Sequence, residues 1–361
     1  MKGWKFMFLA WNEIMKNKLR FILIIGVLML VSYLVFFLSG LATGLKDLNR
    51  EAVDKWEADG IILTEESDKS LSQSSLDLDN EKDVDARETA VLGQINAIAR
   101  EGDKKTNIAL FGIRKDEFLM PNIEEGTVFS KKNEVVASDA LKDDGFKLGD
   151  TLQLSSSEEK LKIVGFTNHA RFNAAPVLYG DLDTFKEVKF GKAQNPNMKD
   201  QINAIVVRGD IKDSVSNSEL EGVEIETFIE NLPGYTEQNL TLTFMIYFLF
   251  IISSVIVAIF LYVLTVQKIS MFGLMKAQGI SNFYLAKSVV AQTFILAFLG
   301  VFVGLVLTLI TGKFLPSEVP VSFDIATMIL YGVILIIVAI LGAVFSVFTI
   351  FKIDPLKAIG G

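Results

Sequence analysis

Four long stretches of this chain contain no charged residue, and they divide the sequence into apolar spans and polar connections. They cover residues 21–45, 238–267, 288–312 and 325–351. An α-helix rises about 1.5 Å per residue, so roughly 20 apolar residues cross a hydrocarbon core about 30 Å thick. Each stretch is therefore long enough to span a bilayer. The pattern predicts an integral membrane protein.

The connections between these stretches differ greatly in length, which restricts the topology. The first is long and dense in charge, whereas the other two are short. In order, we expect an amphipathic helix at the cytoplasmic interface (1–20), transmembrane helix 1 (21–45), an extracytoplasmic domain (46–237), transmembrane helix 2 (238–267), a cytoplasmic coupling segment (268–287), transmembrane helix 3 (288–312), a short outer loop (313–324), transmembrane helix 4 (325–351) and a cytoplasmic tail (352–361). The predicted fold class is a polytopic α-helical membrane protein, with four transmembrane helices and one α+β extracytoplasmic domain between helices 1 and 2.

The long connection is predicted to fold rather than to act as a linker. Short apolar runs rich in Val, Ile and Leu alternate with turns along it, which is typical of β-strands. Residues 138–144 and 181–188 resemble short helices, and Asp181 is a candidate cap for the second. Residues 71–88 are rich in Ser and Asp and hold few large apolar side chains, so we expect a mobile loop there.

The charges are segregated along the chain, and this predicts its orientation. Half of the residues are hydrophobic, yet 22% are charged. The acidic excess lies in the long connection, whereas basic residues flank the first span, the 268–287 segment and the last span. Because cytoplasmic loops are enriched in Lys and Arg, we expect both termini inside the cell and the acidic domain outside. The chain has no Cys, so a bacterial plasma membrane is the expected location.

The sequence offers little for catalysis. It contains no Gly-x-x-x-x-Gly-Lys-[Ser/Thr] phosphate loop, no Cys and a single histidine, His169. Cys/His metal sites and His-based triads are therefore unavailable, and we expect no catalytic or metal site. None of the spans holds an ionisable pair, which argues against an ion-coupled pump. Energy for any transport must come from another polypeptide.

The segment after the second span has the features of a docking element. It can continue as a helix with Met271, Leu274 and Met275 on one side and Lys276 beside them. Gly279 can adopt a positive φ and end this helix, after which a new helix begins. A protruding helix with one apolar face fits a groove of a soluble partner.

Two glycine pairs predict close contacts between helices. Gly40 with Gly44, and Gly300 with Gly304, are separated by three residues in apolar segments. Such small-residue pairs allow neighbouring helices to approach closely in lipid.

Several motifs in one order resemble those of a known family. EVVASDAL (134–141), KLGDTLQL (147–154) and LKIVGF (161–166) resemble the periplasmic core of FtsX-like, MacB-type ABC transporter permeases. VQKISMFGLMKAQGIS (266–281) resembles the family's segment after its second span, and FKIDPLKAI (351–359) resembles its basic tail. Within the family, FTNHARFNAAPV (166–177) and LPGYT (232–236) are most similar to haem-exporting, DevC-like permeases.

The resemblance implies a non-enzymatic permease subunit that works in a complex. The expected partners are a second copy of the chain, two ABC ATPase subunits and the lipid bilayer, with no nucleic acid. ATP and Mg²⁺ would bind to the ATPase, and the coupling residues would be Met271, Leu274, Met275, Lys276 and Gly279. No covalently bound cofactor is expected.

Three functions remain open within the family. The first is export of haem, as transported substrate, or of a similar hydrophobic toxic compound. The second is mechanotransmission to antimicrobial peptides or lipoproteins, and the third is regulation of cell-wall hydrolases without transport. For haem, the candidate ligands at the outer end of the second span are Tyr235, Glu237, Met245 and Tyr247, because without Cys, and with one His, the iron would need Tyr, Glu or Met.

Overall fold

The computed structural model describes residues 18–155, 157–191, 200–211, 214–316 and 319–351. Most of the predicted amphipathic segment 1–20 and all of the tail 352–361 lie outside these residues. The chain divides into two compact units, one made of residues up to Gly44 and from Leu240 onward, and the other of Leu45–Asn239. Each unit is described by itself below.

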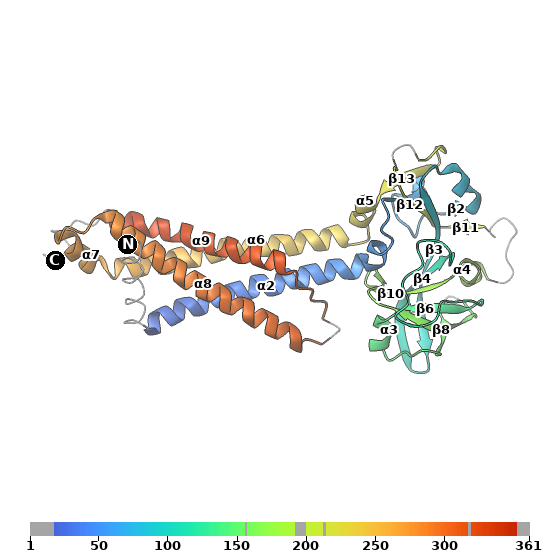
Figure 1. The fold of residues 1–361 in the computed structure, drawn as a ribbon, viewed down its shortest axis with the longest axis horizontal. Coiled ribbons are helices and arrows are strands. Elements are labelled where there is room, and N and C mark those ends of the chain that lie inside the picture. The colour runs from blue at the N-terminus through green and yellow to red at the C-terminus, as the bar shows by residue number, and fades with distance from the viewer. Residues whose placement is uncertain (1–17, 156, 192–199, 212–213, 317–318, 352–361) are drawn as a thin grey trace. The chain divides into compact units, whose positions relative to one another are not determined.

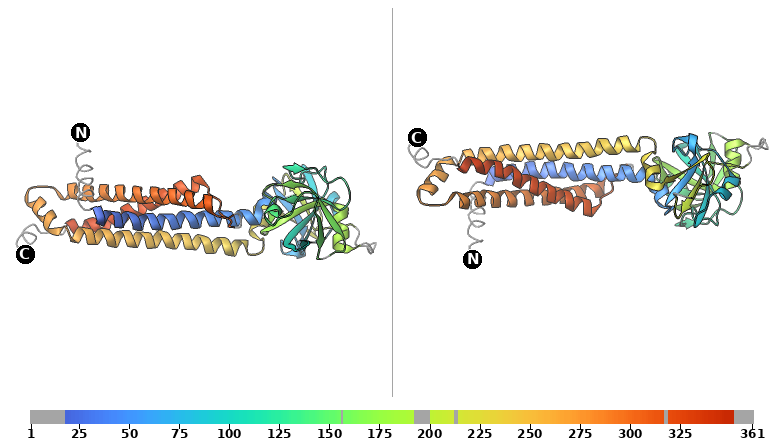
Figure 2. Two further views of the ribbon diagram at one scale, coloured as in Figure 1. Left: turned by 90° about the horizontal axis from the view of Figure 1, so that it is seen from below. Right: turned by 90° about the horizontal axis from the view of Figure 1, so that it is seen from above.

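The first unit is a bundle of long apolar helices. These are α2 (Lys18–Asp54), α6 (Tyr235–Val266), α8 (Asn282–Phe314) and α9 (Ile325–Phe351), with the short α7 (Ile269–Ala277) between α6 and α8. Among the described residues, four helices are long and apolar enough to cross a membrane. They run side by side in all three views (Figures 1 and 2).

The helices extend beyond the charge-free stretches that predicted them. α2 continues past residue 45 to Asp54, α6 begins at Tyr235, and α8 begins at Asn282. Charged residues do not end a helix, because their side chains lie on its surface and reach water. Helices end instead at caps, glycines and prolines.

One predicted glycine pair forms a contact between helices of the same chain. A Cβ atom added to Gly300 would lie 2.6 Å from Leu28 Cβ, and one added to Gly304 would lie 2.9 Å from the backbone oxygen of Met29. The Ser32 hydroxyl donates a buried hydrogen bond of 3.2 Å to the carbonyl of Gly300. α8 and α2 therefore pack with their backbones in close approach.

The second unit is an α+β domain built on one large mixed sheet. Its strands follow the order β13-β1-β12-β3-β4-β10-β6-β8-β5, with β7 paired to β3 and β8, and β9 paired to β10. Their bounds are β1 Gly60–Thr64, β3 Glu88–Glu101, β4 Lys104–Ile113, β5 Glu125–Gly126, β6 Glu134–Ser138, β7 Thr151–Leu154, β8 Lys160–Thr167, β9 Arg171–Phe172, β10 Ala175–Asp181, β12 Ala204–Arg208 and β13 Leu220–Glu224. β2 (Leu76–Asp77) and β11 (Gln201–Ile202) form a separate pair.

Short helices complete the domain. They are the 3₁₀ helices η1 (Glu65–Ser67) and η2 (Leu78–Asp83), and α3 (Ala140–Asp143), α4 (Leu182–Phe190) and α5 (Ile225–Glu230). Asp181 caps α4 as predicted, because its carboxylate accepts a hydrogen bond from the amide of Asp183. The predicted fold class is therefore confirmed.

The strand β3 holds the two halves of the sheet together. Its first half pairs with β12, its second half pairs with β4, and its end also pairs with β7. One core cluster gathers around Trp56, Phe111 and Tyr179. Another is built around Phe146 and Phe166.

The segment 71–88 is not the mobile loop that its composition predicted. Leu71 and Leu76 are buried, so the few apolar residues present are anchors in the core. Asp77 and Asn80 form a capping box that satisfies the first backbone amides of η2. The expectation was wrong because capping side chains and two buried leucines order this stretch despite its low hydrophobicity.

The side chain of Asn203 joins this segment to the sheet. Its amide group donates hydrogen bonds to the carbonyls of Leu71 and Ser74, at 3.1 and 3.0 Å. Its oxygen accepts from the backbone amide of Gln94 at 2.8 Å and from Lys189 Nζ at 3.1 Å. The residue is almost completely buried, so these four groups depend on its side chain for their hydrogen bonds.

Asn203→Ala is expected to lower the free energy of unfolding of the domain by about 3 kcal/mol, because buried polar groups lose their partners at about 1–3 kcal/mol each. The measurement is pulse proteolysis of the full-length protein in urea. Asn107→Ala, at an exposed position of β4, is the matched control and should cost little. Equal sensitivity of the two variants would contradict the role of Asn203.

Candidate functional site

The turn between α7 and α8 has the geometry that its sequence predicts. Gly279 has a φ of +87°. The amide of Ile280 donates to the carbonyl of Met275 at 3.0 Å, closing the end of α7. The hydroxyl of Ser281 then accepts from the amide of Tyr284 and caps α8. Together α7 and the first turns of α8 form a compact elbow, residues 268–289.

The apolar side chains of the elbow fall into two groups. Phe272, Leu285 and Val289 are buried in a small core, and Met275 packs against them. Met271 and Leu274 are exposed, the latter by 51%. The predicted face of three residues is thus divided, because Met275 lies on the side of α7 that packs against α8.

An exposed aromatic on the elbow was missed from the sequence. Phe283, in the first turn of α8, is 65% exposed. Lys287 lies one turn further along, with its Nζ 4.5 Å from the centre of the Phe283 ring. The signal was available, since a large aromatic two residues after the N-cap Ser281, in a polar turn, has no span to pack into. Lys276 is half-buried, and desolvation lowers the pKa of its amine.

The candidate ligands on α6 do not share one environment. Tyr235 is only 7% exposed and belongs to the core of the domain with Trp56 and Phe228. Glu237, Met245 and Tyr247 are exposed. Residues two apart on a helix point in nearly opposite directions, so Tyr235 and Glu237 cannot act as a pair within one protomer.

An exposed apolar stripe follows the same face of α6 as Glu237. Its members recur at helical spacing: Leu240, Phe244, Phe248, Ile251, Val255, Ile259 and Tyr262. α6 is also the least buried of the long helices, with 18% of its most apolar window buried, against 39% for α8. The stripe is open to lipid or to another apolar helix.

The end of α2 is fixed to the domain by polar contacts within the second unit. Arg50 forms ion pairs with Asp54 at 2.8 Å and with Glu226 at 2.7 Å. Glu51 accepts from the amide of Arg171 at 3.1 Å. In the turn between β9 and β10, the amides of Asn173 and Ala174 donate to the carbonyls of Asn49 and Leu48 in α2. These contacts make the last turns of α2 part of the domain.

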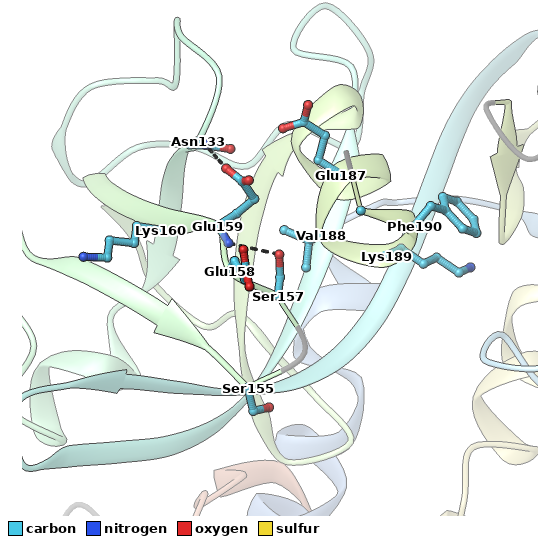
Figure 3. A pocket seen from close by; sticks show the side chains of 11 residues that line it. Asn133, Ser155, Ser157, Glu158, Glu159, Lys160, Glu187, Val188, Lys189 and Phe190 are labelled. Carbon is cyan, nitrogen blue, oxygen red and sulfur yellow. Dashed lines mark hydrogen bonds between the residues drawn. The ribbon is translucent and has the colours of Figure 1, made fainter. Parts of the chain in front are cut away.

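An open cleft of about 940 Å³ lies in the domain between the β7–β8 turn and the end of α4 (Figure 3). It is lined by Asn133, Ser155, Ser157, Glu158, Glu159, Lys160, Glu187, Val188, Lys189, Phe190 and Gly191. Asn133 donates to Glu159 at 3.0 Å, and Glu187 pairs with Lys132. Lys189 points away from the cleft toward Asn203, and its burial lowers its pKa.

The described residues hold no group of three or more His, Cys, Asp or Glu placed to bind a metal ion. His169 is exposed, and its Nδ1 lies 3.8 Å from Glu51.

Sequence comparison covers most of the chain with two domain families. Residues 21–222 match the MacB-like periplasmic core domain, and residues 243–355 match the FtsX-like permease C-terminal domain. The first match alone covers more than half of the chain. The boundary between the matches falls near the start of α6.

Similar proteins extend over the full length. The chain is 26% identical over 359 residues to the "Putative hemin transport system permease protein HrtB" of Staphylococcus haemolyticus, covering 98% of this chain and 99% of that protein. It is 27% identical to the protein of the same name in Staphylococcus epidermidis, with the same coverage. An uncharacterized ABC transporter permease of Mycobacterium tuberculosis is 22% identical, again over 98% of this chain and 99% of that protein.

Among solved structures, the extracellular domain of the noncanonic ABC-type transporter YknZ from Gram-positive bacteria covers 46% of this chain and 99% of that one. The two are 13% identical, with a TM-score of 0.34. The two domain matches, in this order on a membrane protein with an extracytoplasmic core domain, show that the chain belongs to the family of FtsX-like, MacB-type ABC transporter permeases.

Proposed function

We propose that this protein is the permease subunit of a bacterial ABC efflux complex that exports haem or a similar hydrophobic toxic compound from the membrane. The observation that carries the proposal is the full-length similarity to proteins named as hemin transport permeases. The exposed stripe of α6 supports it, because a flat apolar ligand that partitions into lipid would reach such a face laterally. ATP and Mg²⁺ would be held by a separate ATPase subunit.

The elbow is the proposed contact with that ATPase. Met271, Leu274 and Phe283 expose large apolar side chains on a segment that should lie in the cytoplasm. Exposed apolar anchors of this kind dominate the binding free energy of protein interfaces. Lys276 and the turn at Gly279 would set the orientation of the elbow toward the ATPase. Met275 would stabilise the elbow by packing against its small core.

The second proposed partner is another copy of the chain. α6 is the least buried of the four long helices, and its exposed stripe runs the length of the helix. Two stripes facing each other across a two-fold axis would bury both. The haem ligand would then lie near the outer end of α6, between the two copies, in contact with Glu237, Met245 and Tyr247.

The proposed orientation places both termini in the cytoplasm, with the helices in a bacterial plasma membrane. The Lys and Arg residues of the chain support this, because they gather at the segments that would face the cytoplasm. The domain and the connection between α8 and α9 would then face outward.

The first prediction concerns ATP hydrolysis. The purified chain alone should hydrolyse no ATP, and Leu274→Asp should lower transport-coupled ATPase activity of the complex by at least about tenfold, because it puts a charge into an apolar interface. Ser72→Asp, which adds the same charge at an exposed position of the domain, outside the elbow, is the control and should retain activity. Robust hydrolysis by the chain alone, or wild-type coupling in Leu274→Asp, would refute the assignment of the elbow.

The second prediction concerns the ligand. Glu237→Gln combined with Tyr247→Phe should reduce haem-stimulated ATPase activity and haem resistance several-fold, since hard oxygen donors suited to ferric iron are removed. Tyr262→Phe, near the other end of the stripe, serves as the control, and Tyr235→Phe should have little effect because that side chain is buried. A double variant with full haem tolerance, or a wild-type complex whose absorbance never changes with haem, would favour a peptide or protein partner instead.

The third prediction concerns topology. The chain has no Cys, so single cysteines can be introduced as reporters. A membrane-impermeant maleimide on intact cells should label Ser72→Cys in the domain and spare Ser270→Cys in the elbow, both at exposed positions. Permeabilised cells provide the control, in which both should react. Labelling of Ser270→Cys in intact cells would reverse the orientation.

A further inference from the structure

Residues 319–324, the described part of the connection directly before α9, pack onto the backbone of α2. The amide of Ser322 donates a hydrogen bond of 3.0 Å to the carbonyl of Gly40. A Cβ atom added to Gly40 would lie 2.5 Å from the Phe323 ring and 3.1 Å from Val321 Cγ1. One added to Gly44 would overlap the carbonyl of Pro320 and lie 2.9 Å from the amide of Ser322. Both glycines are needed because the connection touches the helix backbone itself.

The ring of Phe323 also contacts α8. A Cβ atom added to Gly312 would lie 2.9 Å from Phe323 Cζ and closer still to another atom of the ring. The ring therefore lies between Gly40 of α2 and Gly312 of α8. It is partly buried and packs against the core cluster that includes Val35, Phe36 and Leu335. A single aromatic side chain links the two helices.

The other end of the connection is fixed to α9. The carboxylate of Asp324 accepts hydrogen bonds from the amides of Ala326 and Thr327, at 3.2 and 3.0 Å, and from the hydroxyl of Thr327. These bonds cap the helix, and the hydroxyl bond of Thr327 is the main reason that the pKa of Asp324 is lowered. Residues 319–324 thus hold α2, α8 and α9 at one place.

The two predicted glycine pairs therefore differ in what they contact. Gly300 and Gly304 bring one helix against another, as such pairs commonly do in membranes. Gly40 and Gly44 instead receive a loop, at a level of α2 from which the helix continues without interruption to Asp54. A loop that packs this closely transmits displacement, because its backbone cannot slide along the helix without losing the fit of Phe323.

We propose that residues 319–324 form a latch that passes movement of α8 and α9 to α2. This inference rests on the proposed function, in which an ATPase acts on the elbow at the start of α8. When the elbow is displaced, α8 moves with it as a rigid body. Because residues 319–324 pack on Gly40 and Gly44, α2 is displaced in turn. The last turns of α2 then deliver that displacement to the extracytoplasmic domain.

The test compares two glycine-to-alanine changes in the same helix. Gly44→Ala places a methyl group against the backbone of Pro320 and should dislodge the latch. Gly26→Ala is the matched control, since a Cβ atom there meets nothing within 4 Å. Both changes favour helix formation, so a difference between them reports the latch and not helix propensity.

Two measurements on the full complex distinguish opening of the latch from loss of the movement that it transmits. In a Val321→Cys background, labelling by a maleimide should be about tenfold faster with Gly44→Ala than with Gly26→Ala, because the latch opens more often. With hemin as the probe, Gly44→Ala should retain ATP hydrolysis but lose most of its export and resistance. The Gly26→Ala complex should behave as wild type in both.

Three results would overturn the latch. The first is unchanged labelling in Gly44→Ala, and the second is faster labelling with normal export per ATP hydrolysed. The third is an equal effect of Gly26→Ala.

If Gly44→Ala is not inserted into the membrane, the same comparison can be made with Phe323→Ala. Its control is Phe314→Ala, at the end of α8, where the ring is almost fully exposed. If the wild-type complex neither responds to hemin nor exports it, the proposed substrate fails. Labelling of Val321→Cys in the Gly44→Ala and Gly26→Ala variants, measured with and without ATP, would still decide whether the latch exists.

Discussion

The bilayer supplies no hydrogen-bond partner for a peptide group, and this constraint shapes the whole molecule. Within lipid each backbone donor and acceptor must find its partner in the protein, and in a helix that partner lies within the same segment. The sheet is consequently confined to the unit outside the apolar bundle, where strand edges and turns can meet water. The helices are long because nothing in the lipid can end them. The starts of α8 and α9 are set by the caps Ser281 and Asp324, which lie beyond the charge-free segments.

Within the bundle, specificity comes from small residues and a few hydroxyls. Apolar side chains are as well solvated by lipid as by each other, so close backbone contact is what distinguishes one helix neighbour from another. Ser32 and the glycines of α8 provide such a contact with α2. α6 contributes Val257 and Leu264 to the core that it shares with α2, α8 and α9, while its stripe remains exposed. All four helices thus build the bundle, and α6 keeps one face open.

The sequence predicted the number and order of the helices because apolar length is a local property that needs no neighbour. It also predicted the turn at Gly279, since a positive φ is a property of one residue. It could not predict which sides of a helix are covered. Met275 and Tyr235 both occur in apolar patterns, yet one packs inside the elbow and the other inside the domain. Burial depends on elements distant in the chain, and the capped segment around Asp77 shows that order likewise depends on partners beyond local composition.

The single long strand β3 has a consequence for how the domain could change during evolution. Its fourteen residues belong to both halves of the sheet, and the first half pairs with β12 while the second pairs with β4 and β7. A recombination event inside the domain would separate strands that share one backbone and leave two unpaired edges. An exchange that keeps the sheet paired would therefore have to transfer the whole segment between α2 and α6.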